Sequence, residues 1–225
     1  MLARLAEDHE VVAVDLPGHG GSSAIAADLA SAAELLGEAG GHGDYLGYSL
    51  GGRIALHLAL ARPDLVRRLV LVGATAGIED DRARAARRQA DEDLADSLVA
   101  AAAADPVDAL EGFLARWLTG PLFATLDPDA AQVAARRSND AAGLASSLRL
   151  CGTGTQAPLW DRLAGLSMPV LVVAGVLDLR FGAMGRRMAQ AIGPNATLAL
   201  VPGAGHACHL ERPAAVAGIV TSFLR

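Results

Sequence analysis

The chain contains no lysine, so all of its basic side chains are arginines. With 19 basic and 25 acidic residues, its formal net charge is -6, which argues against nucleic acid or an anionic membrane surface as a partner. No apolar run reaches the length that spans a bilayer, and the first residues carry acids where a signal peptide has its apolar core. We therefore expect a cytoplasmic protein without membrane insertion.

Cysteines and aromatic residues are also scarce. The two cysteines, Cys151 and Cys208, have neither metal-binding nor redox spacing, so they predict no metal site and fit a reducing compartment. Aromatic residues make up 4% of the chain, while 52% of the 225 residues are hydrophobic, so aliphatic side chains and alanine must fill the core. This length favours one domain, or one domain with an insertion.

A G-x-S-x-G pentapeptide, Gly47–Gly51, is the most informative motif in the chain. Residues 44–48 before Ser49 have the pattern of a short buried strand, and residues 52–61 after it have that of a helix. A serine at a sharp turn between strand and helix is typical of a nucleophile elbow. The alternative is a chance pentapeptide in a chain rich in alanine and glycine.

The remaining pattern alternates strands with helices, which predicts a parallel sheet with helices on both faces. The predicted strands are 10–15, 43–48, 68–73, 169–175 and 197–201, and the flanking helices are 25–38, 52–61, 181–192 and 213–225. Between the predicted strands 68–73 and 169–175, the sequence becomes charged and rich in alanine, which predicts helices over 80–104, 106–118, 129–139 and 141–150. We expect an α/β-hydrolase core over 1–76 and 156–225, with a helical cap over 77–155.

Two further residues complete a candidate catalytic triad with Ser49. Asp178 follows the predicted strand 169–175, and His206 follows the strand 197–201 in a glycine-rich turn. The order serine, acid, histidine is that of α/β hydrolases. Asp178 could instead be a simple helix cap, and His209 could replace His206.

Several stretches together resemble the 2-succinyl-6-hydroxy-2,4-cyclohexadiene-1-carboxylate synthases, the α/β-hydrolase-fold lyases of the menaquinone pathway. They are Val14–Ser22, Gly47–Arg53, Arg137–Asn139, Gly152–Gln156, Trp160 and Pro202–His206. The first and last are widespread in the fold. Arg53 and the segments 137–139 and 152–156 are more specific to these lyases.

The resemblance implies elimination of pyruvate from 2-succinyl-5-enolpyruvyl-6-hydroxy-3-cyclohexene-1-carboxylate, without a metal or organic cofactor. Ser49 is then the base or proton relay, His206 its partner and Asp178 the orienting acid, while the Leu50 N–H contributes to an oxyanion hole. The alternatives are a carboxylesterase or C–C bond hydrolase on the same triad, and a binding protein that has lost activity. The sequence leaves the oligomeric state open.

The implied substrate is a small tricarboxylate, which gives the arginines a role because guanidinium pairs with carboxylate in bidentate fashion. The resemblance places Arg53, Arg87 and Arg137 at the substrate. It adds Tyr48 and Trp117 to the pocket. Arg84 or Arg88 could stand in for Arg87 on a charged, solvated helix, and Arg136 could stand in for Arg137.

The family normally starts with a strand that ends in a His-Gly loop, which supplies a second oxyanion-hole amide. Met1 here stands inside the helix that follows that loop. In this fold the strand lies between the predicted strands 10–15 and 43–48. We therefore expect the sequence to be N-terminally truncated.

Overall fold

The computed structural model describes residues 1–128 and 133–225. Its central layer is a four-stranded parallel sheet in the order β1-β2-β3-β4. The strands are β1 (Gly43–Tyr48), β2 (Val66–Val72), β3 (Val170–Gly175) and β4 (Ala196–Val201). Because the strands are parallel, their carboxyl ends meet at one edge, and the loops that follow β1, β3 and β4 lie near one another.

Alternate residues of the strands pack against helices on opposite faces of the sheet. Leu69 and Leu71 of β2 belong to one core cluster, with α2 (Leu29–Gly40), α3 (Leu50–Ala61), η4 (Trp160–Gly165) and α8 (Leu179–Ile192). Val70 and Val72 belong to a second cluster, with α1 (Leu2–Leu5), α9 (Cys208–Glu211) and α10 (Pro213–Leu224). The near-continuous apolar run of β2 is therefore explained by burial on both faces.

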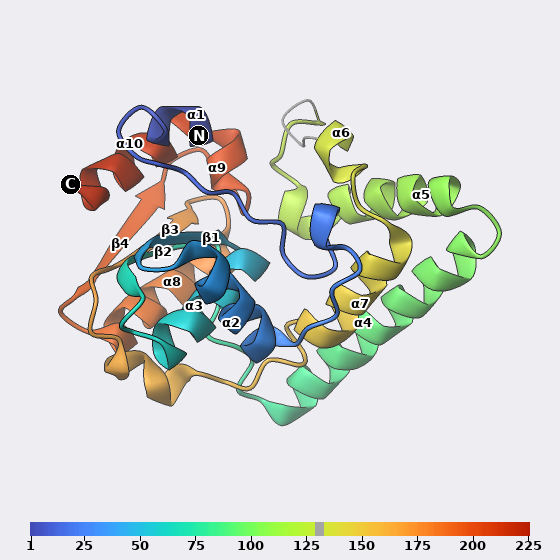
Figure 1. Ribbon diagram of the computed structural model, residues 1–225, viewed down its shortest axis with the longest axis horizontal. Helices are drawn as coiled ribbons and strands as arrows, with labels where there is room; N and C mark the ends of the chain where they lie inside the picture. The colour runs from blue at the N-terminus through green and yellow to red at the C-terminus, as the bar shows by residue number, and fades with distance from the viewer. Residues whose placement is uncertain (129–132) are drawn as a thin grey trace.

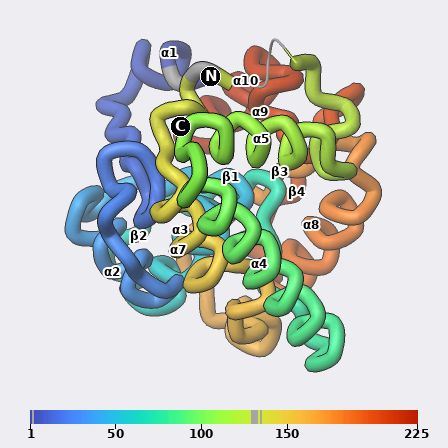
Figure 2. Tube along the Cα trace, turned by 90° about the vertical axis from the view of Figure 1, so that its right-hand side faces the viewer, coloured from blue at the N-terminus to red at the C-terminus, as the bar shows by residue number. Residues whose placement is uncertain are grey.

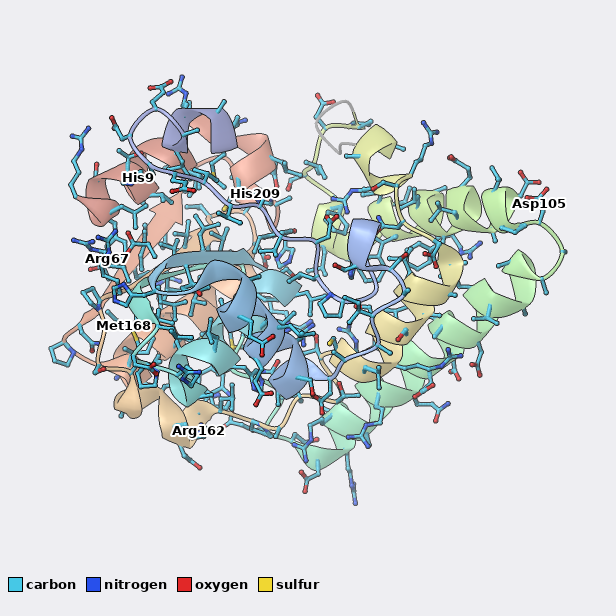
Figure 3. All side chains as sticks on the ribbon, in the orientation of Figure 1. His9, Arg67, Asp105, Arg162, Met168 and His209 are labelled. Carbon is cyan, nitrogen blue, oxygen red and sulfur yellow. The ribbon has the colours of Figure 1, made fainter. Side chains whose placement is uncertain are left out.

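A second group of helices lies to one side of the sheet (Figure 1). It contains α4 (Asp81–Ala102), α5 (Pro106–Leu118), η2 (Pro121–Phe123), α6 (Val133–Arg136) and α7 (Ala141–Cys151). Seen from that side, α4, α5 and α7 lie in front of the strands (Figure 2). Their apolar faces form a core of their own around Leu98, Leu110 and Phe113. Asp105, which caps α5, lies at the far end of this group (Figure 3).

The predicted strand over 10–15 is wrong. These residues form neither helix nor strand, and the described part of the chain shows no backbone hydrogen bond made by them. The side chains are exposed, Val12 by 63%. A strand needs a neighbour to share its hydrogen bonds, and in the described part of the chain β1 pairs with β2 alone. An apolar run predicts that a segment can join a sheet, but the partner decides whether it does.

The other elements differ from prediction by a few residues at their ends. The predicted helix over 129–139 begins at residues that lie outside the described ones, and its described part contains the four-residue α6. A short 3-10 helix, Gly20–Ser22 (η1), lies in the loop before α2. No helix among the described residues is both long and apolar enough to cross a membrane.

Candidate active site

Ser49 occupies the turn between β1 and α3, with φ 49° and ψ -107°. It is the one residue other than glycine with positive φ in the described part of the chain. The turn is crowded: a Cβ at Gly47 would lie 2.2 Å from the Gly51 carbonyl oxygen, and one at Gly52 would lie 2.7 Å from the Ala74 Cβ. Glycine at both positions therefore lets the strand and helix meet closely enough to force Ser49 into this strained conformation.

The structure brings Asp178, His206 and Ser49 into one line of polar contacts. Nδ1 of His206 lies 2.9 Å from Oδ2 of Asp178, and Nε2 lies 3.4 Å from Oγ of Ser49. Asp178 also caps α8, because its Oδ1 accepts from the Phe181 N–H at 3.0 Å. The two interpretations of Asp178, as helix cap and as site residue, thus describe the same side chain.

The charge of Asp178 is stabilised by these contacts. Burial raises the pKa of its carboxyl, but the hydrogen bonds from His206 and from the Phe181 N–H outweigh burial and hold the pKa below its usual value. An ionised carboxylate at Nδ1 orients the imidazole so that Nε2 faces the serine. The arrangement can accept a proton through Ser49 and His206.

His209 does not take the place of His206. Its Nδ1 is buried without a hydrogen-bond partner, and its ring packs against Tyr48 with centroids 4.2 Å apart. Burial lowers the pKa of His209 to about 4, so the ring is neutral at physiological pH. It is a packing residue behind Tyr48.

A cavity of about 560 Å³ opens above Ser49, between the sheet edge and the second group of helices. The chain has only eight aromatic residues, and six of them line this cavity. They are Tyr48, Phe113, Trp117, Phe123, Trp160 and Phe181. Tyr48 and Trp117, the predicted pocket residues, are among them. The ring of Phe181 packs against His206, with the two ring centroids 4.4 Å apart. An apolar wall with a few polar groups is typical of a small-molecule site.

Leu50 also lines the cavity, as the first residue of α3. Amides in the first turn of a helix have no intrahelical acceptor, and the helix dipole adds positive potential there. The backbone N–H of Leu50 is therefore suited to an oxyanion.

Arg53 lies on the cavity wall one turn after Ser49 and is 7% exposed. Its Nη1 donates to two neutral oxygens, the Gly152 carbonyl and Oε1 of Gln156, each at 3.4 Å. Burial lowers its pKa to about 10, which leaves the guanidinium charged at neutral pH. It has no carboxylate within 4.0 Å among the described residues.

Arg87 is the arginine of α4 that reaches the cavity, whereas Arg84 and Arg88 are not among the described residues that line it. Nε of Arg87 donates to both carboxylate oxygens of Asp91, at 2.9 and 3.0 Å, and Asp91 is 4% exposed. Arg84 donates to the Ile78 carbonyl at 2.9 Å, and Arg88 to the Gly154 carbonyl at 3.4 Å. Arg87 therefore meets the cavity already paired with a carboxylate.

The placement of Arg137 at the substrate needs correction. Arg137 is exposed and pairs with Glu111 of α5, with Nη2 3.0 Å from Oε2. Its neighbour Arg136 lines the cavity instead, and burial lowers the pKa of the Arg136 guanidinium. Adjacent residues on a helical turn point in directions about 100° apart, so the sequence alone could not say which of the two faces inward.

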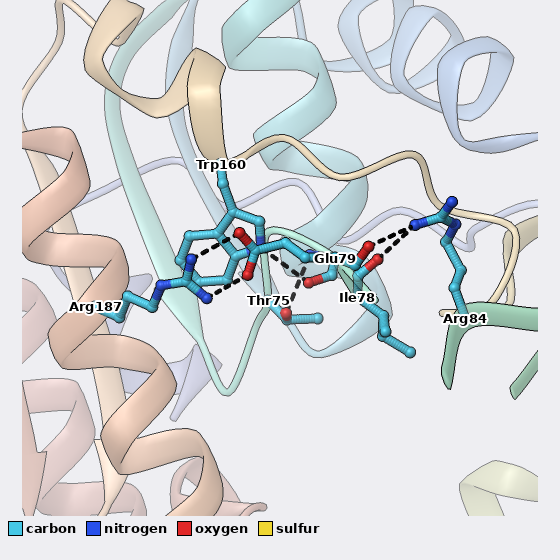
Figure 4. Close-up of polar contacts among 7 residues, drawn as sticks. Thr75, Ile78, Glu79, Arg84, Trp160 and Arg187 are labelled. Carbon is cyan, nitrogen blue, oxygen red and sulfur yellow. Dashed lines mark hydrogen bonds and ion pairs between the residues drawn. The ribbon is translucent and has the colours of Figure 1, made fainter. Parts of the chain in front are cut away.

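Sequence reasoning missed the polar contacts that hold the segment 75–79, which leads from β2 to α4 (Figure 4). The indole of Trp160 donates to the Gly77 carbonyl at 3.0 Å, and Arg187 of α8 pairs with Glu79, with Nη2 2.8 Å from Oε1. The Arg187 guanidinium also lies over the Trp160 ring, 3.9 Å from its centroid. These partners are far apart in sequence, so no local pattern signals them.

The comparisons with known proteins agree with this geometry. Residues 1–213 match the alpha/beta hydrolase fold family. A putative 2-succinyl-6-hydroxy-2,4-cyclohexadiene-1-carboxylate synthase from Bacillus subtilis is 32% identical, over 99% of this chain and 84% of its own length. The synthase from Klebsiella pneumoniae is 35% identical, over 94% of this chain and 82% of its own. A solved structure of MenH from S. aureus superposes with a TM-score of 0.88 at 28% identity, covering 99% of this chain and 86% of that one.

Proposed function

Because the chain belongs to the α/β-hydrolase-fold family of 2-succinyl-6-hydroxy-2,4-cyclohexadiene-1-carboxylate synthases, enzymes of menaquinone biosynthesis, we propose that it eliminates pyruvate from 2-succinyl-5-enolpyruvyl-6-hydroxy-3-cyclohexene-1-carboxylate. One observation carries the proposal: the polar relay from Asp178 to Ser49 opens into a cavity whose wall holds a buried, charged arginine. An enzyme that hydrolyses neutral esters needs no such cation, whereas an enzyme that binds a tricarboxylate does.

The reaction begins at the C–H bond beside the succinyl ketone. Ser49, backed by His206, takes this proton, and the negative charge moves onto the ketone oxygen, near the Leu50 N–H. As the charge returns to the ring, a new double bond forms and the C–O bond to the enolpyruvyl group breaks. The departing enolate takes a proton and becomes pyruvate, so no water enters the product.

The arginines bind the carboxylates. We assign Arg53 to one of them, since no carboxylate among the described residues lies within 4.0 Å of its guanidinium. Arg136 and Arg87 lie on the side of the cavity formed by residues 77–155, which we propose to be the cap. Tyr48 and Trp117 supply apolar surface to the ring of the substrate.

Pyruvate release is the direct test. The purified protein is incubated with the substrate, and pyruvate is followed by coupled oxidation of NADH with lactate dehydrogenase. We expect release by the wild type and none by Ser49→Ala. A wild type that cleaves 4-nitrophenyl esters but releases no pyruvate would favour a carboxylesterase or C–C bond hydrolase on the same triad.

A further inference from the structure

Gln156 is the most buried polar side chain near the cavity, at 1% exposure, yet it is not among the described residues that line it. Its Nε2 donates to the Thr75 carbonyl at 3.3 Å, and its Oε1 accepts from Nη1 of Arg53 at 3.4 Å. A carbonyl only accepts and a guanidinium only donates, so the two partners permit one orientation of the amide. Both partners line the cavity, and Arg53 is the one of the two that carries a charge.

The partners of Arg53 differ from those of Arg87 and Arg187, two other arginines that line the cavity. Arg87 pairs with Asp91, and Arg187 pairs with Glu79. Arg53 has instead two neutral oxygens, from Gly152 and Gln156. A glutamate of nearly the same shape at 156 would place a carboxylate at the guanidinium and cancel its charge.

From this contrast we infer that Gln156 is a positioning residue: it fixes the Arg53 guanidinium toward the cavity while, as a neutral acceptor, it leaves the positive charge for a carboxylate of the substrate. The inference rests on the proposed function and deepens it. It explains why an amide, rather than an acid, is buried beside a buried cation.

The backbone around Gln156 makes this orientation rigid. A Cβ at Gly152 would lie 2.5 Å from Oδ2 of Asp91, and one at Gly154 would lie 2.2 Å from the Arg88 backbone nitrogen, so α4 packs directly onto this segment. Thr75 precedes α4, and Gln156 follows α7. The hydrogen bond between them thus ties together the two ends of the helical group and anchors the side chain that holds Arg53.

The test is a double-mutant cycle on KM and kcat for pyruvate release, with wild type, Gln156→Met, Arg53→Met and the double variant. We expect Gln156→Met to raise KM severalfold with kcat within about twofold, and to have no further effect once Arg53 is replaced. Gln156→Glu should raise KM by at least about tenfold, because it neutralises the cation. Gln190→Glu, the same change at an exposed position of α8, serves as the control and should leave KM unchanged.

The possible failures are distinct. If Gln156→Met raises KM equally with and without Arg53, its role is structural and the inference is wrong. A wild-type KM in Gln156→Glu also refutes it, and this variant decides alone if circular dichroism shows that Gln156→Met does not fold. A wild type that releases no pyruvate refutes the proposed function itself, and the inference with it, whatever the variants do.

Discussion

The strained backbone of Ser49 makes a prediction about stability that is separate from catalysis. Both Ser49→Ala and Ser49→Gly remove the hydroxyl and should abolish turnover, but only glycine adopts φ 49° and ψ -107° without strain. A residue held in such a region costs on the order of 1–3 kcal/mol. Glycine in turn lowers the free energy of unfolding by about 0.5–1 kcal/mol relative to alanine, because it gives the unfolded chain more freedom. We therefore expect Ser49→Gly to be more stable than Ser49→Ala by about 1 kcal/mol.

Thermal and urea unfolding of the two variants measure this difference. For a domain of this size, 1 kcal/mol corresponds to a rise in Tm of about 2–4 °C. The control is Ser97, which is exposed in the middle of α4. There the order should reverse, with glycine about 0.5–1 kcal/mol less stable than alanine. If the Ser49 pair shows the same order as the Ser97 pair, the turn stores no strain and the reasoning fails.

Three further predictions concern the site and two partly buried histidines, His57 of α3 and His209. Asp178→Asn keeps the cap on α8 but removes the charge at His206, so kcat should fall by about 10⁴ while Tm changes little; a loss below tenfold would contradict the relay. Arg136→Ala should raise KM at least about tenfold and Arg137→Ala less than about twofold, and the reverse order would restore the original assignment. Burial lowers the pKa of His57 and His209 to about 4, so between about pH 6.5 and 4 the unfolded chain takes up protons that the folded chain refuses. The free energy of unfolding should therefore decrease as the pH falls through this range, by up to about 1.4 kcal/mol per pH unit for each histidine. In urea unfolding, His57→Gln should show a smaller dependence of this free energy on pH.

Features that depend on neighbouring residues were determined by the sequence. The turn at Ser49 follows from the flanking glycines and from the change from strand to helix pattern. Asp178 and His206 could be selected because each directly follows a buried strand, and parallel strands deliver such positions to one edge. The helical group was recognisable from its composition, since in this charged, alanine-rich sequence the apolar residues recur with the spacing of helices and not of strands.

Features that depend on distant partners were decided only by the tertiary structure. The valines of residues 10–15 have the pattern of a strand, but among the described residues no strand pairs with them, and they remain exposed. Arg136 and Arg137 differ by one position, and only the packing of α6 sends one to the cavity and the other to Glu111. Gln156 stands in a segment that resembles the lyases, but its hydrogen bonds to residues about 80 and 100 positions away could be known only from the fold. A sequence pattern reports what a residue can do, and the fold decides which partner it meets.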